Sequence, residues 1–206
     1  MKTFNRKEHW ETIYSTKALN EVSWYQPTPE TSLEFIKNNI VSKDEAIIDI
    51  GGGDSFLVDY LIEAGYTDIT VLDISEKAIE RAKLRLGENA KKATWIVQDI
   101  TQFKPERKYA IWHDRAVFHF LTDPEDIQKY TQISALALEE KGKKLIGTFS
   151  ESGPKKCSGI EIRQYSENTL KKTFEGDFIP LECFFENHIT PFDTVQNFIF
   201  CSFEKK

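Results

Sequence analysis

The fold is decided by residues 46–55, which read AIIDIGGGDS. A short apolar run that ends in three consecutive glycines and leads into an apolar helical pattern predicts a buried strand, a tight turn and the start of a helix. Open α/β sheets bind their ligands at this end of a strand. Glycine at 51 and 53 lets the backbone approach a ligand and reach positive φ, and the N–H groups that begin the helix attract a carboxylate. The stretch therefore predicts a ligand site.

Apolar runs of this kind recur along the rest of the chain. They alternate with amphipathic helical segments, an order typical of parallel βαβ units. We expect further strands at 69–74, 94–100, 109–114 and 143–150, and helices at 56–65, 76–86, 123–138 and 167–174. The end of the chain differs, because two apolar segments flank a turn and predict an antiparallel hairpin, at 180–190 and 194–205.

Two helices are expected before the first strand. Apolar residues recur at helical spacing in residues 5–16, and again in residues 28–40 after a proline. Between these helices, residues 21–26 predict a loop that carries two adjacent large aromatic residues, Trp24 and Tyr25. The N-terminal part of the chain thus lies outside the alternating βα pattern.

Length and composition exclude several classes of protein. The chain has 206 residues, 40% of them hydrophobic, which predicts a single domain with its own core. A net charge of −6 makes nucleic acid an unlikely partner. The N-terminus lacks a signal-peptide core, and no apolar stretch is long enough to span a membrane. Three cysteines without metal-ligand spacing cannot all pair within the chain, so we expect no metal site and a reducing, cytoplasmic location.

Two aspartates end the next two predicted strands. Asp73 ends the second strand, where an exposed carboxylate would accept hydrogen bonds from both hydroxyls of a ribose. Asp99 ends the third strand, beside the apolar Ile100, where an acceptor and an apolar surface suit an adenine ring. Either residue alone could simply cap the following turn or helix. Together with Asp49, they place three acidic side chains at successive strand ends.

These motifs resemble those of the class I S-adenosylmethionine-dependent methyltransferase family. The family motif is an acidic residue followed by Gly-x-Gly-x-Gly, matched by Asp49, Gly51 and Gly53 and departing at Ser55, whose hydroxyl can cap the new helix. The resemblance spans nearly the whole chain. It implies a Rossmann-like α/β fold with a seven-stranded sheet, mostly parallel with a C-terminal antiparallel hairpin, and helices on both faces. It also implies a single domain over residues 1–206, with residues 1–45 as an N-terminal helical lid.

The same resemblance implies that the cofactor is S-adenosylmethionine and that the product is S-adenosylhomocysteine. Its methionine end would lie against Asp49, the glycine loop and Ser55, its ribose beside Asp73 and Ile74, and its adenine beside Asp99 and Ile100. The residues expected to bind the cofactor are Asp49, Gly51, Gly52, Gly53, Ser55, Asp73, Ile74, Asp99, Ile100, Asp114 and Trp24.

Two other functions are considered. A nicotinamide dinucleotide enzyme would need Gly-x-Gly-x-x-Gly, but the position of its third glycine is Phe56, and Asp99 would have no role. A module that binds the cofactor without turnover would show the same motifs, and only an assay of turnover separates it from an enzyme.

The reacting end is expected to lie after the fourth strand, within residues 111–121. Strand alternation places Trp112 and Asp114 on one face and His113 on the other. We expect Asp114 and His119 at the rim of the acceptor site, although a histidine that only packs against its aromatic neighbours is an equal alternative for His119. His113 and His188 are expected to be structural.

The resemblance to enzymes with an N-terminal lid implies that Trp24 and Tyr25 close over the sulfonium, with Tyr25 near the reacting atoms. Alternatively, these rings only fix the second helix to the core. Residues 153–159, bracketed by glycines, predict a second mobile loop, with Arg163 and Tyr165 behind it. The acceptor is expected to be a small molecule or a protein side chain, and the oligomeric state is not indicated.

Overall fold

The computed structural model describes residues 4–206, which form one seven-stranded sheet with helices on both faces. Its strand order is β3-β2-β1-β4-β5-β9-β8, in which β9 runs antiparallel to both of its neighbours. The predicted fold class is therefore confirmed. The strands are β1 (Ile47–Ile50), β2 (Ile69–Asp73), β3 (Ala93–Val97), β4 (Tyr109–Arg115), β5 (Leu138–Phe149), β8 (Phe178–Ile189) and β9 (Val195–Lys205), with a separate small hairpin of β6 (Lys156–Cys157) and β7 (Ile160–Glu161).

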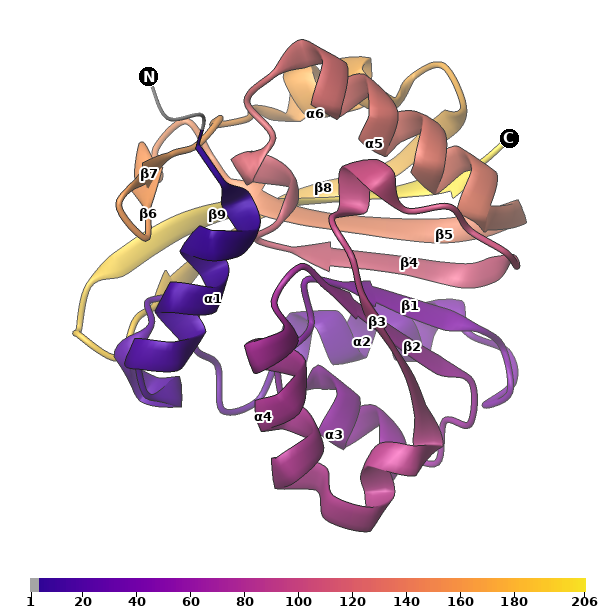
Figure 1. Cartoon of the computed structure of the whole chain (residues 1–206). Helices are drawn as coiled ribbons and strands as arrows, with labels where there is room; N and C mark the ends of the chain where they lie inside the picture. The colour runs from indigo at the N-terminus through magenta and orange to yellow at the C-terminus, as the bar shows by residue number, and fades with distance from the viewer. Residues whose placement is uncertain (1–3) are drawn as a thin grey trace.

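Helices cover the sheet on both sides, as Figure 1 shows. On one side lie α5 (Pro124–Ala137) and α6 (Glu167–Phe174), and on the other α2 (Glu30–Asn39), α3 (Leu57–Glu63) and α4 (Glu76–Leu86). The first helix, α1 (Arg6–Thr16), lies beside α4 at one end of the sheet. Short 3-10 helices connect these elements, at Leu19–Glu21, Gly87–Lys92, Ile100–Gln102 and Phe118–Phe120.

Two apolar layers hold the helices to the sheet. Trp112 and Tyr130 belong to the layer under α5 and α6, while Ile36 and Leu61 pack under α2 and α3 on the opposite face. Burial of such side chains contributes roughly 1.5–3 kcal/mol each. Local signals agree with this arrangement, because Asp123 caps the N-terminus of α5 directly before a proline.

The strand register brings the predicted site residues to one edge. Ile50 at the end of β1 pairs with Leu72 of β2 and with Asp114 of β4, and Asp73 pairs with Val97 of β3. Because these strands are parallel, their carboxyl ends and the segments that follow them meet at the same edge of the sheet.

Three features were not expected from the sequence. Strand β5 begins at Leu138, directly after α5, and the loop that follows it contains the β6–β7 hairpin. Cys183 and Cys201 lie opposite each other on β8 and β9, with their Cα atoms 4.2 Å apart, and form a disulfide, while Cys157 is buried and free.

Within residues 4–206, no helix is long and apolar enough to cross a membrane, and no cluster of side chains suits a metal ion.

Candidate functional site

The glycine turn after β1 is shaped by its own neighbours. Gly51 has a φ of +70°, as expected for a glycine that turns the chain out of a strand. A Cβ atom at Gly51 would clash with Val117, and one at Gly53 would lie 2.7 Å from both Ala78 Cβ and Asp73 Oδ2. The glycines therefore let the turn pack directly against the residues that end β2 and follow β4.

Asp73 is buried, which corrects the expectation of an exposed carboxylate. Only 4% of its surface is exposed, and its two oxygens accept hydrogen bonds from the backbone N–H groups of Gly53, at 3.0 Å, and Ser75, at 2.8 Å. Burial raises the pKa of Asp73 to about 6, against the opposing effect of these two hydrogen bonds. The side chain holds the glycine turn and the start of α4 together while also lining a cavity.

Asp49 has one satisfied oxygen and one without a partner. Its Oδ1 is hydrogen-bonded to His113 Nδ1 at 2.7 Å, and His113 Nε2 lies 2.7 Å from Ser32 Oγ. Its Oδ2 is buried beside Gly52 and has no hydrogen-bond partner among residues 4–206. Since a buried polar atom without a partner is costly, Oδ2 is suited to a donor such as the ammonium group of an amino acid. His113 therefore orients Asp49, and its expected structural role stays a prediction.

Asp99 both caps a turn and faces a cavity. Its Oδ1 accepts hydrogen bonds from Thr101 N, at 2.8 Å, and from Thr101 Oγ1, at 2.7 Å, while its Oδ2 lies 3.4 Å from Arg6 of α1. Ile74 and Ile100 line the same cavity. Asp99 can therefore cap the turn and also face a ligand, the two roles that the sequence leaves open.

Ser55 lies two residues before the helix that follows the glycine turn. Its Oγ accepts the N–H of Leu57, the first residue of α3, at 3.1 Å. The hydroxyl thus supplies the expected cap, although the residue directly before the helix is Phe56, which has no side-chain acceptor.

Two adjoining cavities lie at this edge of the sheet. They share five lining residues, Tyr14, Trp24, Ile50, Gly51 and Arg115. Of the predicted site residues, the first cavity adds Asp73, Ile74, Asp99 and Ile100, and the second adds Asp49, Gly52, Ser55 and Tyr25. The structure thus brings most of the expected cofactor residues to one continuous site, while Gly53 lies behind it, against Asp73.

Asp114 does not lie at a rim, which corrects its expected position. The residue is fully buried and lines neither cavity. Its oxygens accept hydrogen bonds from Tyr130 OH, at 2.6 Å, and from the N–H groups of Val117, at 3.0 Å, and Phe118, at 3.3 Å. Burial raises its pKa to about 6. Trp112 shares its face and His113 lies on the other, as alternation predicted, but this face is the packed interface with α5.

His119 is also buried, and its expected position at the rim is likewise wrong. Its ring lies between Phe120 and Phe149, with centroids 4.5 Å from each, and its Nδ1 accepts the N–H of Phe149 at 3.3 Å. Burial lowers its pKa to about 3, with a further contribution from Arg115, so the ring is neutral at physiological pH. The geometry matches the alternative in which His119 packs and holds the loop.

Aromatic residues of the N-terminal segment close the two cavities. Trp24 lies 5.7 Å from Trp10 and 6.3 Å from Tyr14, and Trp10 lies 4.9 Å from Phe120, measured between ring centroids. Tyr25 packs on the other side, 6.1 Å from Phe56. Trp24 and Tyr25 therefore contribute to the walls of these cavities, and their closing as a lid stays a prediction. Residues 1–3 of the predicted 1–45 segment lie outside the described part of the chain.

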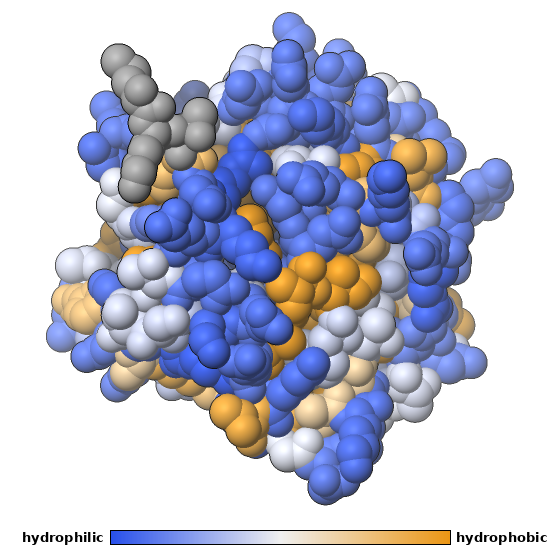
Figure 2. Space-filling view, viewed as in Figure 1, coloured by the Kyte–Doolittle hydropathy of each residue, from blue (hydrophilic) through white to orange (hydrophobic). Residues whose placement is uncertain are grey.

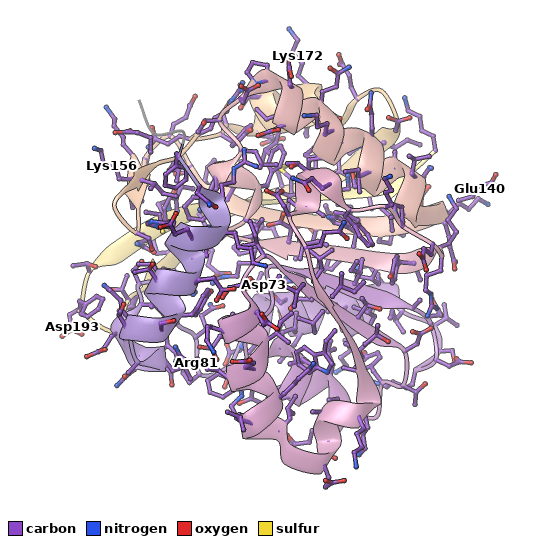
Figure 3. All side chains as sticks on the ribbon, viewed as in Figure 1. Asp73, Arg81, Glu140, Lys156, Lys172 and Asp193 are labelled. Carbon is purple, nitrogen blue, oxygen red and sulfur yellow. A yellow bond between two sulfur atoms is a disulfide. The ribbon has the colours of Figure 1, made fainter. Side chains whose placement is uncertain are left out.

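Charged contacts hold α1 in place. Glu11 accepts hydrogen bonds from the backbone N–H groups of Glu76, at 2.7 Å, and Lys77, at 3.2 Å, at the N-terminus of α4. Arg81 of α4 donates to the carbonyl oxygens of Tyr14, at 3.1 Å, and Lys17, at 2.8 Å. Figure 3 shows Arg81 on the side of α4 that faces α1, and hydrophilic residues cover much of the surface around α1 in Figure 2.

Sequence reasoning missed several residues of the site. Arg115 ends β4 and lines both cavities, and Cys157 of the predicted second loop reaches the first cavity. Arg6, Trp10, Tyr14 and Gln98 also contribute to its walls. The only signal for Arg115 was its position at a strand end, whereas the contribution of α1 depends on contacts between segments about 65 residues apart.

Comparisons with known proteins find a methyltransferase domain. A family model described as a methyltransferase domain matches residues 47–142. The eEF1A lysine and N-terminal methyltransferase of Mus musculus is 28% identical over 130 residues, which are 61% of this chain and 18% of that protein. The malonyl-[acyl-carrier protein] O-methyltransferase of Anoxybacillus flavithermus is 31% identical over 119 residues, 56% of this chain and 43% of that protein. The chain thus spans about a fifth of the first relative and less than half of the second.

Solved structures support the fold. The N-methyltransferase NodS from Bradyrhizobium japonicum, in complex with S-adenosylhomocysteine, superposes with a TM-score of 0.72 at 15% identity, covering 98% of this chain and 99% of that one. A SAM-dependent methyltransferase from Anabaena variabilis gives a TM-score of 0.76 at 14% identity, covering 99% and 96%. The seven-stranded topology, the motif after β1 and these matches agree: residues 47–142 match a methyltransferase domain, and the chain has the fold of S-adenosylmethionine-dependent methyltransferases.

Proposed function

We propose that this protein transfers a methyl group from S-adenosylmethionine to an acceptor that is a small molecule or a protein side chain. The observation that carries the proposal is the pair of joined cavities along the carboxyl ends of β1 to β4, lined by acids from three successive strands. When bound, the cofactor supplies a methyl group on a positively charged sulfur, and the methyl carbon bonds to a lone pair of the acceptor as its bond to sulfur breaks, leaving S-adenosylhomocysteine.

The residues at the site fit the parts of this cofactor. Asp49 Oδ2, which lacks a partner within residues 4–206, suits the ammonium group of the methionine end. Asp73 retains acceptor capacity for ribose hydroxyls after its two backbone contacts, because each carboxylate oxygen has two lone pairs. Ile74 and Ile100 offer apolar surface for adenine, with Asp99 as a polar neighbour.

The protein's contribution to rate is positioning and exclusion of water. Trp10, Trp24 and Phe120 form an apolar wall over the first cavity, and a displacement at a charged sulfur gains most from fixed orientation and a dry site. Asp114 and His119 are held in the packed interior and do not reach the cavities. We therefore assign them to positioning of the segment after β4, and we leave Tyr25, which lines the second cavity, as the candidate beside the reacting atoms.

Alternative functions have less support. In a dinucleotide enzyme, the third glycine of the motif allows helix and strand to pack closely, yet here Phe56 carries its ring 4.5 Å from the guanidinium of Arg85.

The names of the relatives give a protein side chain in one case and an acyl-carrier-bound acid in the other, so both classes of acceptor stay within the proposal.

A turnover assay separates an enzyme from a binding module. Purified protein is incubated with methyl-labelled cofactor and a cell extract divided into protein and small-molecule fractions. We expect label in one fraction and stoichiometric release of S-adenosylhomocysteine. Binding of S-adenosylhomocysteine without transfer of label to either fraction would favour the non-catalytic module.

A cytoplasmic location is retained only as a proposal. The proposal comes from the spacing and the odd number of the cysteines. The disulfide between Cys183 and Cys201 favours an oxidising compartment instead, because disulfides are rare in reducing compartments. Alkylation of thiols in cell lysate, followed by mass spectrometry of this cysteine pair, distinguishes the two states.

A further inference from the structure

Arg115 is a partly buried cation of the site to which the cofactor assignment gives no role. It ends β4 and lines both cavities. Its Nη1 donates a hydrogen bond to the carbonyl oxygen of Trp24 at 3.1 Å. Its Nε and Nη2 are buried and have no hydrogen-bond partner among residues 4–206. Two of its nitrogens therefore have unused hydrogen-bond donors.

The guanidinium packs against β9. Its central carbon lies 4.9 Å from the centroid of the Phe198 ring. The charged group that most affects it is Glu186 of β8, and no carboxylate of the described residues forms an ion pair with it. Cys157, which lines the first cavity, also lies near, and burial raises the pKa of its thiol to about 11, so it is neutral at physiological pH.

The charge of Arg115 persists despite its burial. Burial lowers the pKa of its guanidinium to about 10, which still leaves the group protonated at neutral pH. Arg115 in turn contributes to the lowered pKa values of His119 and His188, whose main cause is burial. A buried charge without a partner destabilises a fold, and a bound anion would offset that cost.

We propose, as an extension of the proposed function, that Arg115 binds a carboxylate group of the methyl acceptor. Guanidinium groups recognise carboxylates through two parallel N–H···O bonds, and Nε with Nη2 forms one such edge. The acceptor is therefore an organic acid whose methylated atom lies within reach of that carboxylate.

Charge favours this ligand over the alternatives. The other arginine of the first cavity, Arg6, is already paired with Asp99 and Asp126, so a single free cation suits a singly charged carboxylate better than a phosphate ester. A lysine side chain as acceptor would bring a second positive charge next to Arg115. The methionine carboxylate of the cofactor is the competing source, because Arg115 also lines the second cavity together with Asp49, and the measurements below separate the two.

The test uses the intact protein and a small-molecule extract. The extract is divided on an anion-exchange column before the reaction, and each fraction is assayed for acceptance of labelled methyl groups. We expect the acceptor in the retained, anionic fraction. Arg115→Gln should raise the KM for that fraction about 10- to 100-fold, the range expected for loss of charge-assisted hydrogen bonds. Arg115→Lys should restore part of the loss, because it keeps the charge without the bidentate edge.

Two further measurements make the outcome specific. Calorimetry with S-adenosylhomocysteine should show a much smaller loss of affinity in Arg115→Gln than the rise in KM for the acceptor fraction, and saturable binding also shows that the variant folds. Arg107→Gln removes an exposed arginine paired with Asp68, far from the cavities, and should behave like the unaltered protein in both assays.

Each contrary result has a separate meaning. An acceptor found only in the unretained or protein fraction would overturn the carboxylate proposal and leave the proposed function intact. A large loss of S-adenosylhomocysteine affinity in Arg115→Gln, with no loss of affinity for 5′-methylthioadenosine, would overturn it in favour of the cofactor's own carboxylate. Absence of transfer to any fraction by the unaltered protein would overturn both proposals.

Discussion

The contact between Glu11 and the N-terminus of α4 is expected to keep the lid closed. The carboxylate of Glu11 accepts hydrogen bonds from the N–H groups of Glu76 and Lys77, and from Ser75 Oγ at 3.0 Å. Ser75 also caps α4 itself by accepting the N–H of Ala78, so Glu11→Ala should leave α4 formed. The substitution is therefore expected to weaken the docking of α1 without unfolding the domain.

The size of the effect follows from the contacts that are lost. Hydrogen bonds to a charged group contribute about 1.5–3 kcal/mol, and Glu11 is half-exposed, so we take about 1.5 kcal/mol, or roughly a tenfold larger open population. Amide hydrogen exchange in residues 6–26 should then accelerate about tenfold without ligand. Added S-adenosylhomocysteine should slow exchange in both proteins, because a lid over a ligand loses its open conformations.

A matched control lies on the same helix. The exposed side chain of Glu8 forms no hydrogen bond or ion pair with other residues of the 4–206 segment, so Glu8→Ala should leave exchange nearly unchanged. Equal exchange rates in the two variants would refute the role of the contact between Glu11 and α4. Exchange in residues 6–26 that does not depend on ligand would refute the lid.

Two further substitutions test the buried acids. Asp73→Asn should weaken binding of S-adenosylhomocysteine at least tenfold by calorimetry. It should also lower the melting temperature, because the carboxylate accepts hydrogen bonds from the N–H groups of Gly53 and Ser75. Unchanged affinity would show that Asp73 is a purely structural residue. Burial raises the pKa of Asp114 to about 6, so the folded state binds the extra proton and the free energy of unfolding should fall as pH rises from about 4 to 6. Asp114→Asn should flatten that dependence by about 1–3 kcal/mol in urea titrations and keep turnover within about tenfold; a loss of turnover with unchanged stability would instead make Asp114 catalytic.

The strands and the cofactor side of the site could be predicted from the sequence because their signals are local. The run from Ala46 to Ser55 contains both the strand and its turn, and the parallel order of strands then places Asp73 and Asp99 at the same edge. The sequence does not show that these acids also form hydrogen bonds within the fold. Asp73 is buried because the glycine turn packs on it, a contact that depends on the position of Gly53.

The acceptor side could not be predicted because it depends on long-range packing. Asp114 follows the expected alternation, but its partner Tyr130 lies on α5, and the ring of His119 packs against Phe149 of β5. The contact of Glu11 with α4 likewise joins segments that no local pattern connects. From the sequence, Asp114 and His119 are therefore expected beside the acceptor, whereas long-range packing places both side chains in the interior.

Binding of the cofactor is the property on which the proposed function depends. Isothermal titration calorimetry of the purified protein with S-adenosylhomocysteine and, separately, with NAD measures it directly. We predict saturable binding of S-adenosylhomocysteine with one site per chain, and no measurable heat with NAD, because Phe56 occupies the position of the third dinucleotide glycine. Tight binding of NAD together with no response to S-adenosylhomocysteine would contradict the proposed function.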